Sequence, residues 1–350
     1  MIGAGMAGFS CAQRLRQAGY SVAVVEKSRG AGGRVATRRV QGTRADHGAR
    51  YLEPQGDAVQ GLMEVLVDRH ILKLWTDSVG EFRQGEMFSI PSSCYVAPAG
   101  MNAIGKYLAE DLDIWYGRRA KAISRTDSQM WHLSLEVTDD NLQIPQELIA
   151  KAVVVAIPAP QALMFLDAEI GLPSDFLDKF RSVEYDPCIT VMAGYSAAKQ
   201  QDLSNLNPQW KSVSYPDNAD LAWIGWDSSK RLDPQQPVFV VHSSAIFAER
   251  YLEAADLETV GQELLDRTSE YLMPWLKQPE WLQVHRWRYA FCRNPLPVSC
   301  LAAGGTLPLV CAGDLCGEGQ IEGALRSGLA AANWVNSQLQ NLPLDSSLNW

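Results

Sequence analysis

The chain has 350 residues, which is long enough for two domains or for one sheet domain with a large insertion. Its net charge of −9 at pH 7 argues against a nucleic-acid binder, which needs a basic stripe to contact phosphates. No apolar run is as long as a membrane span, residues 1–18 do not form a signal peptide, and the seven cysteines include no C-x-x-C pair. We therefore expect a cytoplasmic protein without nucleic-acid or membrane partners. Because its five histidines are scattered, we also expect no metal site.

A glycine-rich segment opens the chain. Gly3, Gly5 and Gly8 have the G-x-G-x-x-G spacing at the start of a predicted helix. In a dinucleotide-binding turn the first glycine allows the tight turn, the second lets the backbone approach a diphosphate, and the third lets helix and strand pack closely. Only two residues precede the first glycine, so we expect the first strand of the motif to be too short to pair fully.

The strand predicted at residues 21–26 ends in Glu26, at the spacing expected for the acid that binds a ribose 2′-hydroxyl. Because an acid here repels a 2′-phosphate, the motif favours FAD or NAD over NADP. A second glycine cluster, which includes Gly33, suits a further phosphate contact through a backbone nest and cations. A simple NAD domain does not need this second loop, so the loop favours FAD over NAD. The alternative is that the segment is an ordinary mobile loop that binds no phosphate. The basic residues of the cluster are Lys27, Arg29 and Arg34.

Together the two glycine clusters resemble the flavin amine oxidase superfamily, in which the second cluster contacts the diphosphate and ribityl chain of FAD. Residues 44–51 resemble a further segment of this superfamily, whose small residues let the backbone lie close to the flavin ring. His47 in this segment is interpreted either as an acid–base group or as a side chain that caps the backbone. The residues that the resemblance places near the isoalloxazine are Gly48, Ala49 and Arg50.

The middle of the chain is predicted to leave the FAD domain and return to it. Two short strands are expected to begin a substrate-side insertion, at 71–75 and 81–82. A helix at 102–112, capped by Asn102, should follow the return. The apolar run at 151–158 is typical of a strand buried on both faces in a parallel sheet. The superfamily places such a strand under the adenine of FAD, which makes Ala156 a cofactor-binding candidate.

From residue 172 to about 301 the pattern becomes rich in strands and predicts an antiparallel sheet that covers the flavin. Strands are expected at 189–195, 222–226, 238–244 and 284–289, and helices near 174–181 and 257–272. The predicted fold class is therefore α/β, with a Rossmann-type FAD-binding domain and an antiparallel β-sheet substrate domain, as in p-hydroxybenzoate hydroxylase and the amine oxidases. We assign the FAD-binding domain to residues 1–54, 98–170 and 302–340, and the substrate domain to residues 55–97 and 171–301.

The second half of the flavin site is expected near the C-terminus. An apolar strand ends in Gly313 and Asp314, and a helix with a small-residue face follows from about residue 320. The dipole at the start of this helix would stabilise the negative charge of a reduced flavin, and Asp314 is expected to bind the ribityl chain or a ribose. The alternative is a small-residue helix that only packs on the sheet. The candidates in the first turn of the helix are Glu322, Gly323 and Ala324.

With both ends matched, the whole chain is most similar to the renalase family and its bacterial branch. The segments that carry this resemblance are 26–34, 156–161, the H-R-W-R-Y-A stretch at 285–290, and 313–314 with 322–324. The resemblance implies an enzyme that holds FAD non-covalently and oxidises the 1,2- and 1,6-dihydro isomers of NAD by hydride transfer to flavin N5. It also implies that O2 reoxidises the flavin to give H2O2 and that NAD is released.

Such chemistry mainly requires an aromatic wall and a few hydrogen-bond donors, because the flavin performs the redox step. The expected catalytic candidates are Trp287, then His242 and Trp223, although the last two could instead be core residues. Arg288 should point to the opposite side of its strand and form a salt bridge. Two other functions stay open at this point: an amine oxidase or desaturase for a small apolar substrate, and a flavin-binding protein without turnover.

Overall fold

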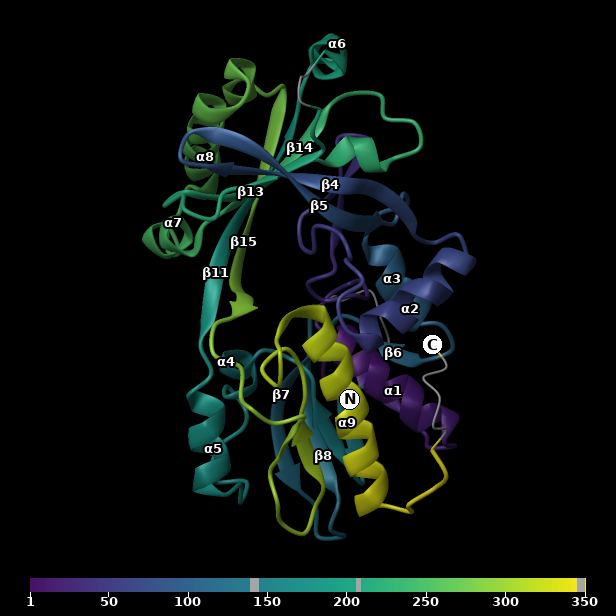
Figure 1. The fold of residues 1–350 in the computed structure, drawn as a ribbon. Helices are drawn as coiled ribbons and strands as arrows, with labels where there is room; N and C mark the ends of the chain where they lie inside the picture. The colour runs from purple at the N-terminus through teal and green to yellow at the C-terminus, as the bar shows by residue number, and fades with distance from the viewer. Residues whose placement is uncertain (139–144, 206–208, 345–349) are drawn as a thin grey trace.

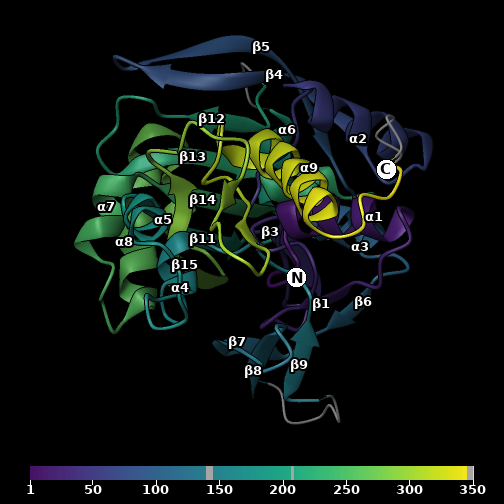
Figure 2. The same ribbon diagram turned by 90° about the horizontal axis from the view of Figure 1, so that it is seen from below.

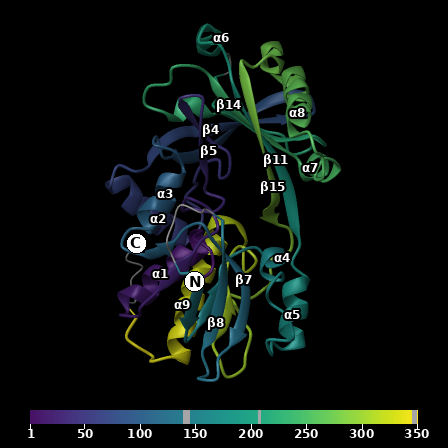
Figure 3. The ribbon, with the colours of Figure 1, turned by 180° about the vertical axis from the view of Figure 1, so that it is seen from behind.

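The computed structural model describes residues 1–138, 145–205, 209–344 and 350. Its helices and strands form two parts, one above the other in Figure 1. The lower part contains the glycine-rich start of the chain and the last helix, and the upper part contains a large sheet with helices on one side. Two long strands, β11 (Tyr185–Gly194) and β15 (Trp281–Cys292), extend from the upper part towards the lower one (Figures 1 and 3).

The lower part is built on parallel strands. β1 pairs with β6, and β10 pairs with β17, which also carries the short antiparallel β16. Ile2 joins the two pairs through parallel bridges to Val25 and Val155, so the expected first strand is present as isolated bridges. All three valines of β10 are buried, as predicted for a strand covered on both faces. The strands are β1 (Ala23–Val25), β6 (Asp113–Trp115), β10 (Val153–Val155), β16 (Leu301–Ala302) and β17 (Leu309–Cys311).

Helices α1 (Met6–Gln17) and α9 (Gln320–Gln338) come from opposite ends of the chain and pack against each other in the lower part (Figure 1). A Cβ atom on Gly328 would lie 2.2 Å from the carbonyl oxygen of Ala7, so only glycine allows this close approach. The hydroxyl of Ser10 donates to the carbonyl oxygen of Leu325 at 3.1 Å. The lower part is therefore complete only when both ends of the chain meet.

Helix α3 (Asn102–Leu108) shows that the prediction of an Asn102 cap was wrong. The N-cap is Met101, and no side chain of α3 caps the helix. Instead Asp46 accepts from the backbone N–H of Met101 at 2.9 Å, and Thr37 accepts from that of Asn102 at 3.1 Å. The caps thus come from a separate hairpin, which local sequence cannot reveal, and the helix ends earlier than the expected residue 112.

The upper sheet has seven strands in the order β15-β11-β14-β13-β12-β4-β5. All neighbours are antiparallel except β12 and β4, which run parallel, so the expected purely antiparallel sheet is in fact mixed. The strands predicted at 189–195, 222–226, 238–244 and 284–289 are all present, with longer β11 and β15. The remaining strands of the sheet are β4 (Lys73–Arg83), β5 (Glu86–Val96), β12 (Ser212–Ser214), β13 (Leu221–Trp226) and β14 (Val238–Ser243).

The β4–β5 hairpin corrects the prediction of two short strands at 71–75 and 81–82. These residues belong largely to one continuous strand, β4, and the following segment pairs back on it as β5 (Figure 2). Six of the eleven residues of β5 are exposed, most residues of β4 are only partly buried, and β5 contains Pro91 among serines. Because both of its faces meet water over much of its length, the apolar alternation that marks a half-buried strand is missing.

Helices α7 (Ala245–Arg250) and α8 (Leu257–Tyr271) pack against one face of the upper sheet and cover an apolar core (Figure 1). Helices at the predicted 174–181 and 257–272 are confirmed as α5 and α8. In the described ranges no helix is both long and apolar enough to span a membrane. The other elements are α2 (Asp57–Asp68), α4 (Ala159–Ala162), α5 (Ser174–Arg181), α6 (Lys199–Ser204), η1 (Asp227–Lys230), η2 (Pro274–Lys277), β2 (Thr37–Val40), β3 (Thr43–Asp46), β7 (Arg118–Arg125), β8 (Trp131–Val137) and β9 (Glu147–Ala150).

Candidate functional site

The three glycines of the first turn have different surroundings. Gly3 has φ +105°, and a Cβ atom on it would lie 2.5 Å from the carbonyl oxygen of Ala156. A Cβ atom on Gly8 would lie 2.0 Å from the carbonyl oxygen of Gly3. In contrast, a Cβ atom on Gly5 would meet nothing within 4 Å. Gly3 and Gly8 are therefore required for packing, whereas Gly5 leaves space beside the start of the helix, where a diphosphate can lie.

The start of α1 is suited to bind an anion. Its N-cap is Gly5, which has no side chain that could cap the helix, and its first turn contains no acidic residue. The first N–H groups and the helix dipole are thus available to a phosphate. Nearby, the buried carboxylate of Glu26 accepts from the backbone N–H groups of Ala4 at 2.9 Å and Ser28 at 2.8 Å. These contacts hold the acid in place, and its oxygens have further lone pairs for a ribose hydroxyl.

The second glycine cluster packs against the first turn, and the ring-facing segment, residues 44–51, packs against the second cluster. Gly33 has φ +58°, and a Cβ atom on it would lie 3.3 Å from Cα of Gly5. A Cβ atom on Gly48 would lie 1.9 Å from the carbonyl oxygen of Arg34, which accepts from the backbone N–H of Ala49 at 2.9 Å. The structure therefore brings the three predicted flavin-contact segments together into one packed unit.

Arg34 and Asp314 join the two ends of the predicted cofactor site. Two guanidinium nitrogens of Arg34 donate to the two carboxylate oxygens of Asp314, both at 2.6 Å. Burial lowers the pKa of Arg34, but Asp314 raises it more, so the guanidinium stays charged. Asp314 was expected to bind the ribityl chain or a ribose, and in this structure both its oxygens contact Arg34. Such a bidentate pair fixes the planar guanidinium of Arg34 at the predicted cofactor site.

The remaining candidates lie at the edges of this unit. Lys27 and Arg29 are exposed, and the ammonium of Lys27 donates to the side chain of Gln161 at 3.3 Å. The carboxylate of Glu322 accepts from the first backbone N–H groups of α2, at 2.7 Å from Val59. Its side chain therefore caps a neighbouring helix. Gly323 and Ala324 follow it in the first turn of α9, and a Cβ atom on Gly323 would lie 3.2 Å from the carbonyl oxygen of Cys316.

The expected substrate-side residues lie on the face of the upper sheet opposite α7 and α8. In the strand register His285 pairs with Thr190, Thr190 pairs with His242, and His242 pairs with Trp223. Directly paired residues point to the same face, so these four side chains form one row across β15, β11, β14 and β13. Trp287 lies two residues further along β15 and shares this face. Arg288 points the other way and pairs with Glu253, as predicted.

His47 and Trp287 form an aromatic contact between the ring-facing segment and this sheet. Their rings are stacked, with centroids 5.4 Å apart and an interplanar angle of 23°. The indole N–H of Trp287 donates to the carbonyl oxygen of His47 at 2.9 Å, and His285 packs edge-on against both rings. Burial, with His285 and Arg38 nearby, lowers the pKa of His47 to about 3, and burial with Arg38 lowers that of His285 to about 4. Both imidazoles are therefore neutral at pH 7.

Arg50 reaches from the ring-facing segment onto the row. Its Nε donates to Nδ1 of His242 at 3.2 Å, and its guanidinium carbon lies 5.1 Å from the centroid of the Trp223 ring. Within the described part of the chain Arg50 forms no ion pair, although the carboxylate of Glu53 attracts it from a longer distance and acts to raise its pKa. Glu53 itself accepts a hydrogen bond from Ser92. Burial lowers the pKa of Arg50 below the usual value for a guanidinium. The structure thus places a cation without an ion-pair partner in the described ranges among the substrate-side candidates.

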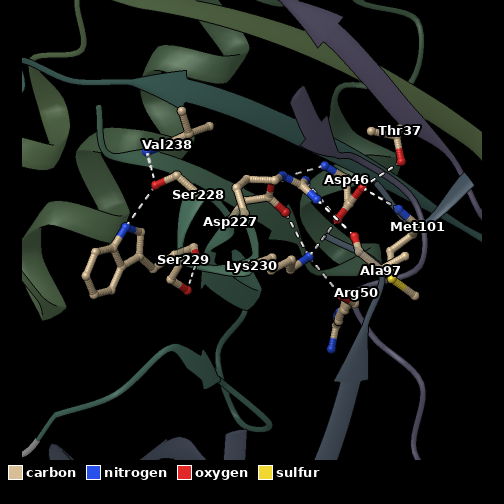
Figure 4. Close-up of polar contacts among 12 residues, drawn as sticks. Thr37, Asp46, Arg50, Ala97, Met101, Asp227, Ser228, Ser229, Lys230 and Val238 are labelled. Atoms are coloured by element: carbon tan, nitrogen blue, oxygen red, sulfur yellow. Dashed lines mark hydrogen bonds and ion pairs between the residues drawn. The ribbon is translucent and has the colours of Figure 1, made fainter. Parts of the chain in front are cut away.

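A buried charge network of Asp46, Asp227, Lys230 and Arg231 joins the ring-facing segment, through Asp46, to the turn η1 and the residue after it (Figure 4). The ammonium of Lys230 lies 2.8 Å from Asp227 and 3.3 Å from Asp46, and Arg231 lies 2.6 Å and 2.9 Å from the same carboxylates. Burial raises the pKa of Asp46, but the two cations outweigh it and lower the pKa below its usual value. Lys230 also donates to the carbonyl oxygen of Arg50 at 2.8 Å. The network therefore fixes the backbone that carries Arg50.

Sequence reasoning missed this network. The spacing of Asp227, Lys230 and Arg231 is a usable signal, because residues three and four apart lie on one side of a helical turn. The pairing with Asp46 has no local signal, since 184 residues separate it from Lys230.

The chain matches two family models. Residues 1–66 match the NAD(P)-binding Rossmann-like domain, and residues 72–336 match the flavin containing amine oxidoreductases. A solved putrescine oxidase with bound putrescine is 15% identical, with 96% of this chain and 98% of that chain covered and a TM-score of 0.70. A cyclohexylamine oxidase from Brevibacterium oxydans is 13% identical, with coverage of 97% and 98% and a TM-score of 0.69. A putative protoporphyrinogen oxidase from Exiguobacterium sp. is 12% identical, with the same coverage and TM-score.

These structural likenesses show the fold, which is the predicted Rossmann-type FAD-binding fold combined with an amine-oxidase-like sheet. The glycine turns, the uncapped start of α1 and the buried Glu26 fit the diphosphate and ribose of FAD. The flavin family model covers more than half of the chain. The protein is therefore an FAD-dependent oxidoreductase that belongs to the flavin-containing amine oxidoreductase family.

Proposed function

We propose that this protein is a renalase-like oxidase of dihydronicotinamide isomers, the 1,2- and 1,6-dihydro forms of NAD. Bound FAD would supply the redox chemistry, namely hydride acceptance at N5 and transfer of two electrons to O2, which with one proton from solvent would give H2O2 and leave NAD as the product. The chain itself has to bind the dinucleotide, orient its flat ring and keep the reacting atoms away from water.

The observation that carries the proposal is that Arg50 has no ion-pair partner within the described part of the chain. An amine is mostly an ammonium ion near neutral pH, and a cation without a neutralising carboxylate repels it. A dihydronicotinamide dinucleotide has no ammonium, and its diphosphate is anionic. The neutral rings of His47 and His285 add no negative charge that would offset Arg50.

Trp287 and His47 supply the flat surface that a nicotinamide ring needs. Their near-parallel stacking, with an interplanar angle of 23°, is held by the hydrogen bond from the indole to the backbone of His47. A planar ring can extend such a stack, because offset aromatic stacking is favourable. This supports a role of Trp287 in orienting the substrate.

Oxidation of an amine is the second candidate function, and one observation favours it. Tyr51, Trp75 and Trp223 lie together, with ring centroids 6.2 Å and 6.4 Å from that of Tyr51, as in an aromatic cage. However, each tryptophan of this group already has a protein cation over its ring. Lys230 lies 5.4 Å from Trp75, and Arg50 lies 5.1 Å from Trp223. These protein cations already make the cation–π contacts that such a cage would offer to an ammonium substrate.

The test is an anaerobic mixing experiment with the FAD-loaded protein. The visible flavin band is followed after addition of the 1,2- or 1,6-dihydro isomer of NAD, of ordinary NADH, or of putrescine. We expect rapid bleaching by an isomer but not by NADH or putrescine, and recovery with H2O2 formation when air is admitted. Bleaching by putrescine alone would establish the amine oxidase instead, and the absence of bleaching by either isomer would reject the proposal.

Two variants test the proposed role of Trp287 as the aromatic surface that orients the substrate. Trp287→Ala is expected to slow bleaching while FAD remains bound, because the indole orients the substrate. Trp210→Ala is the matched control, since Trp210 packs against Phe239 in the core on the other face of the sheet. Release of FAD by Trp287→Ala would place this residue in the fold and not in the substrate site.

A further inference from the structure

The contact with Arg50 fixes the tautomer of His242. The Nε atom of a guanidinium always carries a hydrogen, and it lies 3.2 Å from Nδ1 of His242, so Nδ1 must be the acceptor. Burial, followed by the positive charges of Arg50 and Lys230, lowers the pKa of His242 well below its usual value. The ring is therefore neutral at pH 7, and its one N–H is on Nε2.

Two buried N–H donors of the row have no hydrogen-bond partner within the described ranges, Nε2 of His242 and Nε1 of Trp223. The residues are paired in the register of β13 and β14, and their ring centroids are 5.2 Å apart. His242 is 3% and Trp223 1% exposed, so bulk water does not compensate these donors. Buried polar groups are rarely left unpaired in folded proteins, and two neighbouring ones indicate a bound group that accepts hydrogen bonds.

Arg50 adds a positive charge and further hydrogen-bond donors beside His242 and Trp223. The guanidinium offers charged N–H donors and no acceptor, and it lies over the ring of Trp223. The three residues thus present donors only, together with one positive charge. A matching ligand group has lone pairs and is neutral or negative.

We propose that Arg50, His242 and Trp223 form a subsite for a carbonyl oxygen carried by a flat ring, such as that of a carboxamide or carboxylate. The same subsite excludes ammonium groups, which bring further donors and a second positive charge. This inference rests on the proposed function, where it assigns the subsite to the carboxamide oxygen of the dihydronicotinamide ring. It adds a recognition element that discriminates by hydrogen-bond direction and charge.

Binding of three small aromatic probes to the FAD-loaded protein tests the subsite without turnover. Benzamide, benzoate and benzylamine have similar size, and each is titrated at pH 7 while the visible flavin spectrum is recorded. We expect benzamide and benzoate to bind at least about tenfold more tightly than benzylamine. Equal or tighter binding of benzylamine would overturn the proposal.

Single variants assign the discrimination to the three residues. His242→Phe and Trp223→Phe are each expected to weaken benzamide binding by about three- to tenfold, because each removes one donor. Arg50→Met is expected to reduce the preference for benzamide over benzylamine. His132→Phe, on β8 of the lower part, is the control and should change neither value. If the variants shift the flavin spectrum without probes but leave benzamide affinity unchanged, the donors serve the flavin and the subsite is refuted.

The tautomer provides a readout that is independent of FAD and of folding differences between variants. In protein with ¹⁵N-labelled histidine, His242 should show a neutral ring protonated at Nε2, and a proton on Nδ1 would contradict the assignment. The two proposals also fail separately. Discrimination of the probes without oxidation of the dihydro isomers rejects the proposed function, whereas oxidation without discrimination rejects the subsite.

Discussion

Replacement of Lys230 by methionine is expected to lower the free energy of unfolding by about 3–5 kcal/mol, the usual cost of removing one partner from a buried ion pair. The side chains of Lys230, Asp46 and Asp227 are 0% exposed, and the buried charge network is neutral only when both cations are present. Without Lys230, one carboxylate charge is uncompensated in the interior, and the carbonyl oxygen of Arg50 loses its donor. Methionine fills nearly the same volume, so the effect reports charge more than packing.

Lys199 offers a matched control in the same chain. Like Lys230, it has an aspartate three residues away, and its ammonium lies 3.2 Å from the carboxylate of Asp202. The ammonium also lies 5.6 Å from the centroid of the Trp275 ring. Its side chain is 38% exposed, so Lys199→Met should cost no more than about 1 kcal/mol. Urea unfolding of both variants at equal FAD concentration measures the difference. If Lys230→Met destabilises the protein no more than Lys199→Met does, the argument from buried charge is refuted.

Three further predictions follow from the site. Gly5→Ala should fold normally but bind FAD at least about tenfold more weakly, because its Cβ enters open space at the diphosphate position. Gly8→Ala should instead unfold at a lower temperature, because its Cβ overlaps the carbonyl oxygen of Gly3. FAD titration and thermal unfolding separate the two effects, and equal FAD affinity of Gly5→Ala and wild type would contradict the assignment. His47→Phe should flatten the pH dependence of stability. The unfolded chain binds a proton near pH 6.5 but the folded chain only near pH 3, so wild-type stability falls as pH drops through this window, by up to about 1.4 kcal/mol per pH unit. Urea unfolding between pH 7 and 4 checks this, and parallel slopes for both proteins would be the contrary result. Glu322→Ala should cost about 1–2 kcal/mol by uncapping α2, with faster amide exchange at Val59 as its local signature, and unchanged exchange there would exclude the cap.

The parts of the fold that could be predicted from the sequence are those determined by residues close together in the chain. The glycine turn at residues 3–8 is visible because each glycine has a separate steric or ligand-related reason. The buried strand β10 was indicated by its continuous apolar run. A helix was expected near 257–272, and the structure shows that α8 is capped by Asp256. In contrast, the β4–β5 hairpin lacked the usual alternation because it is exposed on both sides over much of its length.

The candidate site could be predicted as a set of residues but not as a geometry. Trp223 and His242 were chosen separately, and only the strand register shows that they are direct neighbours. The partner of His242, Arg50, lies 192 residues away in the chain. The same limit explains Glu322, which was expected at the flavin and whose carboxylate instead caps a helix 263 residues earlier. Long-range pairing is determined by the tertiary fold and leaves no local pattern.

The meeting of α1 and α9 has a consequence for how the protein is made. The hydrogen bond from Ser10 to Leu325 spans 315 residues, and that from Arg34 to Asp314 spans 280. The glycine turn is synthesised before the helix that packs against it, so the two can meet only after α9 has left the ribosome. Contacts between residues so far apart in the sequence form slowly. The packing of α1 against α9 is therefore expected to form after the upper sheet has folded. Assembly of the FAD-binding part is thereby tied to the synthesis of α9, and a chain that stops before α9 lacks the helix that packs against α1.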